Sequence, residues 1–161
     1  MRECVTSTCN IRWARHEDWI RAMDMVWKTF LKFEGGDYTE EGVKNFFDFI
    51  TDESLEKAFM DGRYKMVVAE ADGRIVGVGT VRNRNLLSLL FVDEDYHHMK
   101  IGTSILEVLW DYITSVEGEY SMIVNAAPYA VDFYKKMGFR QVAPEKAFAG
   151  IRVTAMEKPL R

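Results

Sequence analysis

The stretch NAAPYAVDFYKKMGF, residues 125–139, decides the fold, because it reads as a strand end that runs into a helix with both ends marked. Pro128 suits the first helical turn, where its missing N–H costs no hydrogen bond. Gly138 suits the position just after the last turn, where the backbone is often left-handed. The segment before this stretch, residues 120–124, predicts a strand. A strand followed by a short helix is therefore the first element pair that the sequence establishes.

A second informative stretch is LLFVDEDYHHMKIGT, residues 89–103. It contains the end of a nearly continuous apolar run at residues 86–92, which is typical of a strand covered on both faces and therefore central in the sheet. From Gly102 the apolar residues recur at helical spacing. The helix is expected to bury Ile105, Leu106, Leu109, Tyr112, Ile113 and Val116. Together with the strand at 120–124, this order implies a parallel crossover.

The N-terminal part of the chain predicts one strand and then helices. Residues 11–14 read as a short strand, and an amphipathic helix should follow. Its apolar residues at helical spacing are Ile20, Met23, Trp27, Phe30 and Leu31. After a break at residues 34–37, Thr39 can cap a second helix, which we expect to form a hairpin with the first. A short helix should span residues 54–60.

Antiparallel strands are expected in the rest of the chain. Residues 66–71 and 75–81 are β-rich and are joined by Asp72 and Gly73, a pair suited to the positive backbone angles of a tight hairpin turn. Residues 140–142 and 151–156 read as closing strands after the helix at 128–137.

Composition limits the class of protein. With 161 residues and 48% apolar content, the chain fits one compact domain, residues 1–161. Cys4 and Cys9 are too few for a disulfide framework and are expected to be free thiols. No apolar run reaches the roughly 20 residues of a membrane span, and no signal pattern precedes the first strand. We therefore expect a cytoplasmic protein with no membrane partner. The net charge of −4 argues against nucleic acid as a partner.

The turn before the helix of the crossover is a candidate phosphate site. The first backbone N–H groups of a helix have no partner within it, and the helix dipole is positive there, so anions bind well. Residues 98–103 lie at such a place. The adjacent pair His97 and His98 also suggests a metal site. Neighbouring residues on an extended loop point in different directions, however, so we expect no metal.

The two stretches together resemble the cofactor-binding motifs of the GCN5-related N-acetyltransferases (GNAT). The resemblance implies an α/β fold of the acyl-CoA N-acyltransferase type, with a mixed, mostly antiparallel sheet, a splayed parallel strand pair and helices on both faces. It implies acetyl-CoA as the cofactor. In the family's pyrophosphate loop, His97 replaces a glutamine or arginine and Lys100 replaces a glycine, whereas Gly102 matches. The similarity extends through the closing hairpin at residues 145–158.

The resemblance also implies site residues. Residues on the central strand and Asn125 on its parallel neighbour would contact the pantetheine arm, and Phe133 would pack against the arm or its thiol end. The implied cofactor-binding set is Leu90, Phe91, Val92, His97, His98, Met99, Lys100, Ile101, Gly102, Thr103, Asn125 and Phe133. Tyr134 matches the family's tyrosine, which protonates the departing thiolate. The backbone N–H near Phe91 would polarise the thioester carbonyl.

The general base is not evident from the sequence. Ser88 lies where some relatives carry an acidic residue, so a water relay through Ser88 is one hypothesis. Glu34, Asp37 and Glu70 are weaker candidates that we expect to be ordinary surface carboxylates.

The sequence thus predicts an N-acetyltransferase that moves an acetyl group to a primary amine of a small molecule or peptide by direct attack. The acidic segment 34–41 favours a cationic acceptor, such as a polyamine, an aminoglycoside-like compound, or a lysine or N-terminal amine. The alternative is a non-catalytic acyl-CoA-binding sensor, which the altered pyrophosphate loop and the missing base would explain. The acceptor, the acyl length and a homodimeric state stay open.

Overall fold

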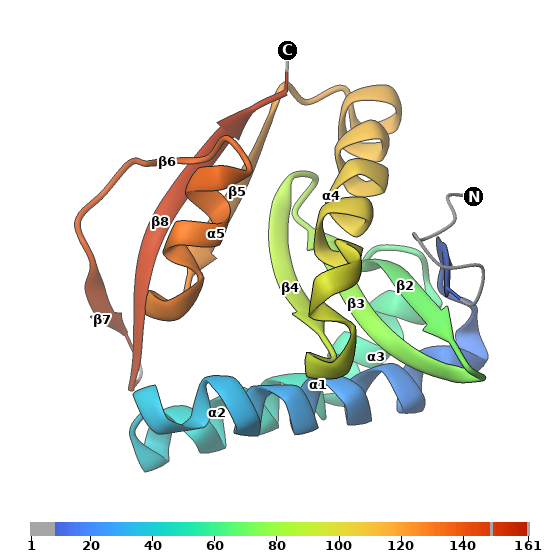
Figure 1. Ribbon diagram of the computed structural model, residues 1–161, viewed down its shortest axis with the longest axis horizontal. Coiled ribbons are helices and arrows are strands. Elements are labelled where there is room, and N and C mark those ends of the chain that lie inside the picture. Colours follow the sequence, from blue (N-terminus) through green and yellow to red (C-terminus); the bar gives the residue numbers. More distant parts are fainter. Residues whose placement is uncertain (1–8, 149, 161) are drawn as a thin grey trace.

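A single mixed sheet organises the chain in the computed structural model, which describes residues 9–148 and 150–160. Its strand order is β1-β2-β3-β4-β5-β8-β6, and β7 pairs with β8 (Figure 1). Every neighbouring pair is antiparallel except β4 and β5. The strands are β1 (Cys9–Trp13), β2 (Lys65–Ala71), β3 (Arg74–Arg82), β4 (Leu86–Val92), β5 (Ser121–Ala126), β6 (Arg140–Gln141), β7 (Lys146–Phe148) and β8 (Ile151–Pro159). The predicted mixed, mostly antiparallel sheet with one parallel pair is confirmed.

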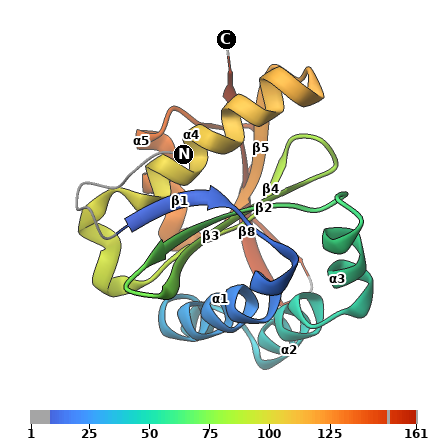
Figure 2. The same cartoon turned by 90° about the vertical axis from the view of Figure 1, so that its right-hand side faces the viewer.

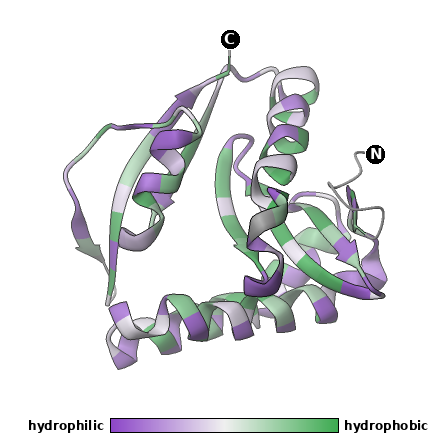
Figure 3. Cartoon of the chain, in the orientation of Figure 1, coloured by the Kyte–Doolittle hydropathy of each residue, from purple (hydrophilic) through white to green (hydrophobic). Residues whose placement is uncertain are grey.

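Helices cover both faces of the sheet, as predicted (Figure 2). The α-helices are α1 (Trp19–Phe33), α2 (Glu40–Ile50), α3 (Glu53–Met60), α4 (Ile101–Tyr112) and α5 (Val131–Lys136). One core lies between the sheet and α4, and a second core lies between the sheet and α1, α2 and α3. In Figure 3 the central strands are largely apolar, whereas α1 carries both apolar and polar residues. The sheet therefore supplies apolar surface to both layers.

Local turn chemistry sets the β2–β3 hairpin. Asp72 and Gly73 have φ values of 54° and 75°, both in the left-handed region. This pair of angles matches the right-handed twist of the flanking strands, and glycine and aspartate tolerate it better than most residues. The predicted tight hairpin is confirmed.

Two expectations about helix faces were wrong. Met23 and Phe30 are buried as expected, but Ile20 is 77% exposed and Leu31 is 49% exposed, because the buried face of α1 is centred on Ala22, Val26 and Phe30. Val116 is 70% exposed rather than inward. It lies in a π-helical turn, η4 (Ile113–Glu117), that continues α4 and changes the helical phase after Ile113.

The N-terminal end of the described chain differs from the expectation in its cysteine chemistry. Cys9 is disulfide-bonded, so the expected free thiol is wrong at this position. Cys4 lies outside the described residues. None of the helices within the described ranges is long and apolar enough to cross a membrane.

Candidate active site

The parallel pair opens into a splay. β4 and β5 pair only at Leu86 with Ile123 and at Leu87 with Val124. Beyond these positions both strands continue, and β5 keeps its other partner, since Asn125 pairs with Ala155 of β8. Within the described chain, the backbone of residues 89–92 thus faces the splay without a strand partner on that side, as the family resemblance implied.

A β-bulge in β4 sets which side chains reach the splay. Leu89 pairs with Thr80 but Leu87 pairs with Val81, which leaves Ser88 as an extra residue. Such a bulge turns the strand and re-aims its side chains. As a result Leu87 packs into the core beside α4, whereas Leu89 and Phe91 pack into the core beside α1.

Ser88 is tied to a buried hydroxyl network. The Tyr64 hydroxyl donates to Ser88 Oγ (3.0 Å) and lies 2.8 Å from Thr80 Oγ1. Tyr64 is only 2% exposed. Because Ser88 Oγ accepts this bond, its own O–H can donate into the splay. This geometry suits a hydrogen-bond donor rather than the base that the relay hypothesis needs.

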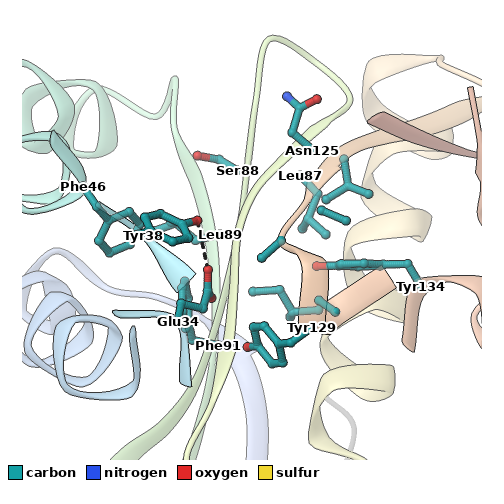
Figure 4. Close-up of a pocket in the computed structure, with 15 residues that line it drawn as sticks. Glu34, Tyr38, Phe46, Leu87, Ser88, Leu89, Phe91, Asn125, Tyr129 and Tyr134 are labelled. Carbon is teal, nitrogen blue, oxygen red and sulfur yellow. Dashed lines mark hydrogen bonds between the residues drawn. The ribbon is translucent and has the colours of Figure 1, made fainter. Parts of the chain in front are cut away.

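A cavity of about 100 Å³ lies in the splay. Carboxylate, amide and hydroxyl groups meet apolar side chains in it. In Figure 4, Glu34 and Tyr38 project toward it from one side, and Tyr129 and Tyr134 project from the other. Its walls are Glu34, Tyr38, Phe46, Leu87, Ser88, Leu89, Leu90, Phe91, Val124, Asn125, Ala126, Ala127, Tyr129, Ala130 and Tyr134.

Tyr134 is 6% exposed, and its ring packs edge-on against Phe133 and Phe139. Burial raises the pKa of its phenol well above the ordinary value, and the nearby Tyr129 and Glu34 raise it further. No hydrogen bond joins its hydroxyl to another residue within the described chain. The phenol is therefore protonated and ready to donate.

Glu34 is 7% exposed, so the expectation of a surface carboxylate was wrong. The Tyr38 hydroxyl donates to its Oε1 at 3.1 Å. Burial raises the pKa of Glu34 to about 7, although Tyr38 and Tyr129 oppose this by hydrogen bonding to the charged form. Asp37 is exposed, and Glu70 lies 3.3 Å from Arg12, outside the cavity. Glu34 is thus the one carboxylate of these three that reaches the site.

A second cavity of about 360 Å³ continues from the first. The two share Leu90, Tyr129, Ala130 and Tyr134, so they form one cleft that passes Tyr134. The second cavity is also lined by the predicted cofactor residues Val92, His97, Lys100, Gly102, Thr103 and Phe133. The predicted residues Phe91 and Asn125 line the first cavity instead.

Two of the predicted cofactor residues point elsewhere. Met99 is 6% exposed and Ile101 is fully buried, and both belong to the core beside α4. Their side chains line neither cavity, so only their backbone can face a ligand. His98 lies in η3 (Glu94–Met99), and its role stays a prediction.

The second cavity fits a long ligand with an anionic end. α4 begins at its edge, and the first N–H groups of the helix have no partner within the helix. Lys100 adds a cation there. A Cβ on Gly102 would lie 3.5 Å from Phe133 and 3.8 Å from Val92, so the glycine leaves the space between these side chains open. The residues present therefore fit the phosphates and the apolar arm of coenzyme A.

Lys100 holds a strained backbone at this edge. Its φ is 56° and its ψ is 32°, a left-handed conformation that costs a non-glycine residue roughly 1–2 kcal/mol. We expect Lys100→Gly to stabilise the protein by about 1 kcal/mol and to raise Tm by about 2–4 °C. Thermal unfolding of Lys100→Gly and Lys100→Ala measures this. The alanine variant keeps the strain and should show no gain; equal Tm values for the two variants would contradict the prediction.

Comparison with known proteins identifies the class. The model of the acetyltransferase (GNAT) domain family matches residues 34–160, so the chain belongs to the GNAT acetyltransferase family, whose members use acyl-CoA and act on amine acceptors. Among curated proteins, no sequence matches this chain.

Solved structures share the fold at low sequence identity. A GCN5-related N-acetyltransferase from Rhodopseudomonas palustris is 23% identical, with a TM-score of 0.79 over 96% of this chain and 98% of that one. The PaiA N-acetyltransferase from Thermoplasma acidophilum, solved in complex with coenzyme A, is 18% identical, with a TM-score of 0.76 over 94% and 98%. A chimera of spermidine N-acetyltransferase SpeG from Vibrio cholerae and hSSAT is 16% identical, with a TM-score of 0.66 over 96% of both chains.

Sequence reasoning missed part of the lining of the first cavity. Tyr38 and Tyr129 were not singled out, and Glu34 was placed on the surface. A signal was present for Glu34: it follows Phe30 by four residues and Val26 by eight, so it continues the buried stripe of α1. Nothing in the local sequence marked Tyr129, whose role depends on the loop between β5 and α5 reaching the end of α1.

Proposed function

We propose that this protein is an acetyl-CoA-dependent N-acetyltransferase that moves an acetyl group to a primary amine of a small molecule or peptide. It acts as a single domain, residues 1–161, in the cytoplasm. The observation that carries the proposal is the continuous cleft, in which the cavity at the start of α4 meets the cavity at Glu34 beside the buried phenol of Tyr134. One side suits the cofactor and the other suits the acceptor.

The residues have separate roles in this proposal. When bound, acetyl-CoA supplies the activated acetyl group. The first turn of α4, with Lys100 and Thr103, holds its phosphates, and Leu90, Val92, Asn125 and Phe133 line the path of its arm. The backbone N–H near Phe91 donates to the carbonyl oxygen as negative charge develops there. Tyr134 gives its proton to the leaving sulfur, because its raised pKa keeps the phenol protonated until the thiolate departs.

The rival function is a non-catalytic acyl-CoA-binding sensor. It was suggested by the altered pyrophosphate loop and by the lack of a base. Glu34 weakens the second reason, because a buried carboxylate and a buried phenol face the same cavity. A sensor needs neither group. The geometry therefore supports the enzyme better.

Acetyl-CoA binding tests the cofactor side of the proposal. We expect calorimetric titration to give a micromolar Kd for acetyl-CoA and weaker binding of dephospho-CoA. Gly102→Val should weaken binding at least tenfold, because its side chain would fill the space between Val92 and Phe133. Ser115→Val, at an exposed position beyond α4, should leave the Kd unchanged. No binding by the wild-type protein would refute the function, and binding without turnover of any amine would favour the sensor.

A further inference from the structure

Glu34 is a buried carboxylate that lacks a cationic partner. It is the C-cap residue of α1, and no lysine, arginine or histidine forms an ion pair with it in the part of the chain that the structure describes. Taking such a group out of water without a countercharge costs several kcal/mol. Tyr38, which donates to it, and the nearby Tyr129 are neutral phenols. When Glu34 is ionised, the site therefore lacks one positive charge to balance it.

The first cavity defines where a balancing positive charge would bind. Glu34 lines the cavity that also holds Tyr134 and Asn125, and it contributes to the electrostatic environment of the Tyr134 phenol. A group bound between Glu34 and Tyr134 would therefore touch both the carboxylate and the place where the thioester must lie. An ammonium group there would balance the negative charge of Glu34 and would lie next to the carbonyl group that reacts.

The cavity also limits the shape of the acceptor. Its volume of about 100 Å³ lies well below the 300–1,000 Å³ of pockets that enclose whole small molecules. Phe46, Leu89 and Phe91 wall it beside the polar groups. The space suits an ammonium group at the end of a thin apolar chain, with the rest of the acceptor outside the cavity. A substituent on the carbon next to nitrogen would meet these walls.

Resting on the proposed function, we propose that Glu34 receives the acceptor as an ammonium ion and removes its proton, and that the acceptor nitrogen is carried on an unbranched methylene chain. The Glu34 carboxylate takes one proton, which leaves a neutral amine with a free electron pair. The C–N bond forms at the acetyl carbon and the C–S bond breaks. Tyr134 gives its proton to sulfur. It then takes up the second proton that the nitrogen loses.

The titratable groups around Glu34 favour this role near neutral pH. Its pKa of about 7 makes it a carboxylate above neutrality and a strong enough base to accept a proton. The groups that face it are Tyr38, Tyr129 and Tyr134, with Asp37 adding a like charge. Burial and the Glu34 charge raise the pKa of all three phenols, so they stay neutral through this range. Of these groups, Glu34 is the one that titrates near pH 7.

The experiment compares Glu34→Gln with Asp37→Asn in the full chain. Both variants remove one carboxylate from the same segment, but Asp37 is exposed and does not line the cavity. With n-butylamine as acceptor, we expect kcat/KM of Glu34→Gln at pH 7.5 to fall roughly 100-fold. The deficit should shrink to less than tenfold at pH 10, where roughly a quarter of an alkylamine with a pKa near that of lysine is already neutral. Asp37→Asn should stay within twofold of wild type at both pH values.

Two controls separate catalysis from folding. The folded-state pKa of Glu34 lies above its ordinary value of 4.5, so the charged form destabilises the fold as pH rises through about 7. Glu34→Gln should therefore have a Tm at pH 8 no lower than that of wild type, and the Kd for acetyl-CoA should not change. A deficit of equal size at pH 7.5 and pH 10, or the same loss in Asp37→Asn, would overturn the role of Glu34.

Acceptor shape is tested with isomers. n-Butylamine and sec-butylamine carry the same charge and nearly the same apolar surface, and we expect at least a tenfold higher kcat/KM for the unbranched isomer. Equal values would overturn the shape proposal. The failures are distinguishable: a wild-type protein that acetylates no amine refutes the proposed function itself, whereas an active wild type with an equally active Glu34→Gln variant refutes only the inference about Glu34.

Discussion

Tyr134→Phe is expected to lower kcat roughly 100-fold while leaving the Kd for acetyl-CoA within about twofold of wild type. The substitution removes one oxygen atom and keeps the ring that packs against Phe133 and Phe139. The hydroxyl faces the cleft and forms no hydrogen bond within the described residues, so its loss breaks no packing contact and no hydrogen bond. In the proposed mechanism, only the proton donor to the leaving sulfur is lost. Steady-state kinetics and calorimetric titration measure the two quantities.

A matched control is available on α4. The Tyr112 hydroxyl donates to Glu117 in the following π-helical turn, and Tyr112 lines neither cavity of the cleft. Tyr112→Phe removes the same atom at a distance from the site and should leave kcat unchanged. A Tyr134→Phe variant with wild-type kcat would show that this phenol only fills space. A parallel rise in the Kd for acetyl-CoA would assign the hydroxyl to binding rather than to proton transfer.

Features with local causes could be predicted from the sequence. Asp72 and Gly73 fix the hairpin through their own backbone preferences, and Pro128 with Gly138 brackets the segment that contains α5. The run at residues 86–92 is apolar because β4 lies between β3 and β5 with helices on both faces. Each of these signals lies within a few residues of the feature that it predicts.

Features that arise from packing between distant segments could not be predicted from the sequence. The bulge at Ser88 comes from a register shift against β3, and no glycine or proline marks it. Glu34 is buried because Tyr38 and the loop that carries Tyr129 close around the end of α1. In the sequence, the charge of Glu34 was the reason to expect this residue on the surface. The candidate base was therefore the part of the site that the sequence placed wrongly, whereas most of the side chains predicted to bind the cofactor do line the cleft.

A buried ion pair fixes the opposite end of α1. Asp18 is fully buried, and Arg12 donates to both of its oxygens, at 2.8 Å and 3.2 Å. The Arg15 backbone N–H (2.7 Å) and the Arg21 guanidinium (3.0 Å) also donate to Asp18. The pair joins β1 to the residue that precedes α1, the helix whose C-cap is Glu34. Its loss should affect the whole fold.

Asp18→Asn is therefore expected to lower the free energy of unfolding by about 3–5 kcal/mol, because it leaves the buried Arg12 guanidinium without its main counterion. That is a large share of the roughly 5–15 kcal/mol that stabilises a typical domain. Glu70→Gln is the matched control. It removes the second, partly exposed carboxylate beside Arg12, at 3.3 Å, and should cost no more than about 1 kcal/mol. Urea unfolding at pH 7 measures both variants, and equal losses would contradict the assignment.

The pH dependence gives the same pair an independent signature. The hydrogen bonds from Arg12 lower the pKa of Asp18 to about 2, below its ordinary value of 3.8. The unfolded chain therefore binds this proton first, so the stabilisation is complete above about pH 4 and declines as pH falls toward 2. Asp18→Asn has no carboxylate to titrate and should show a flatter loss of stability in that range than wild type. Parallel acid-unfolding curves for the two proteins would place the acid sensitivity elsewhere and leave Asp18 as an ordinary polar contact.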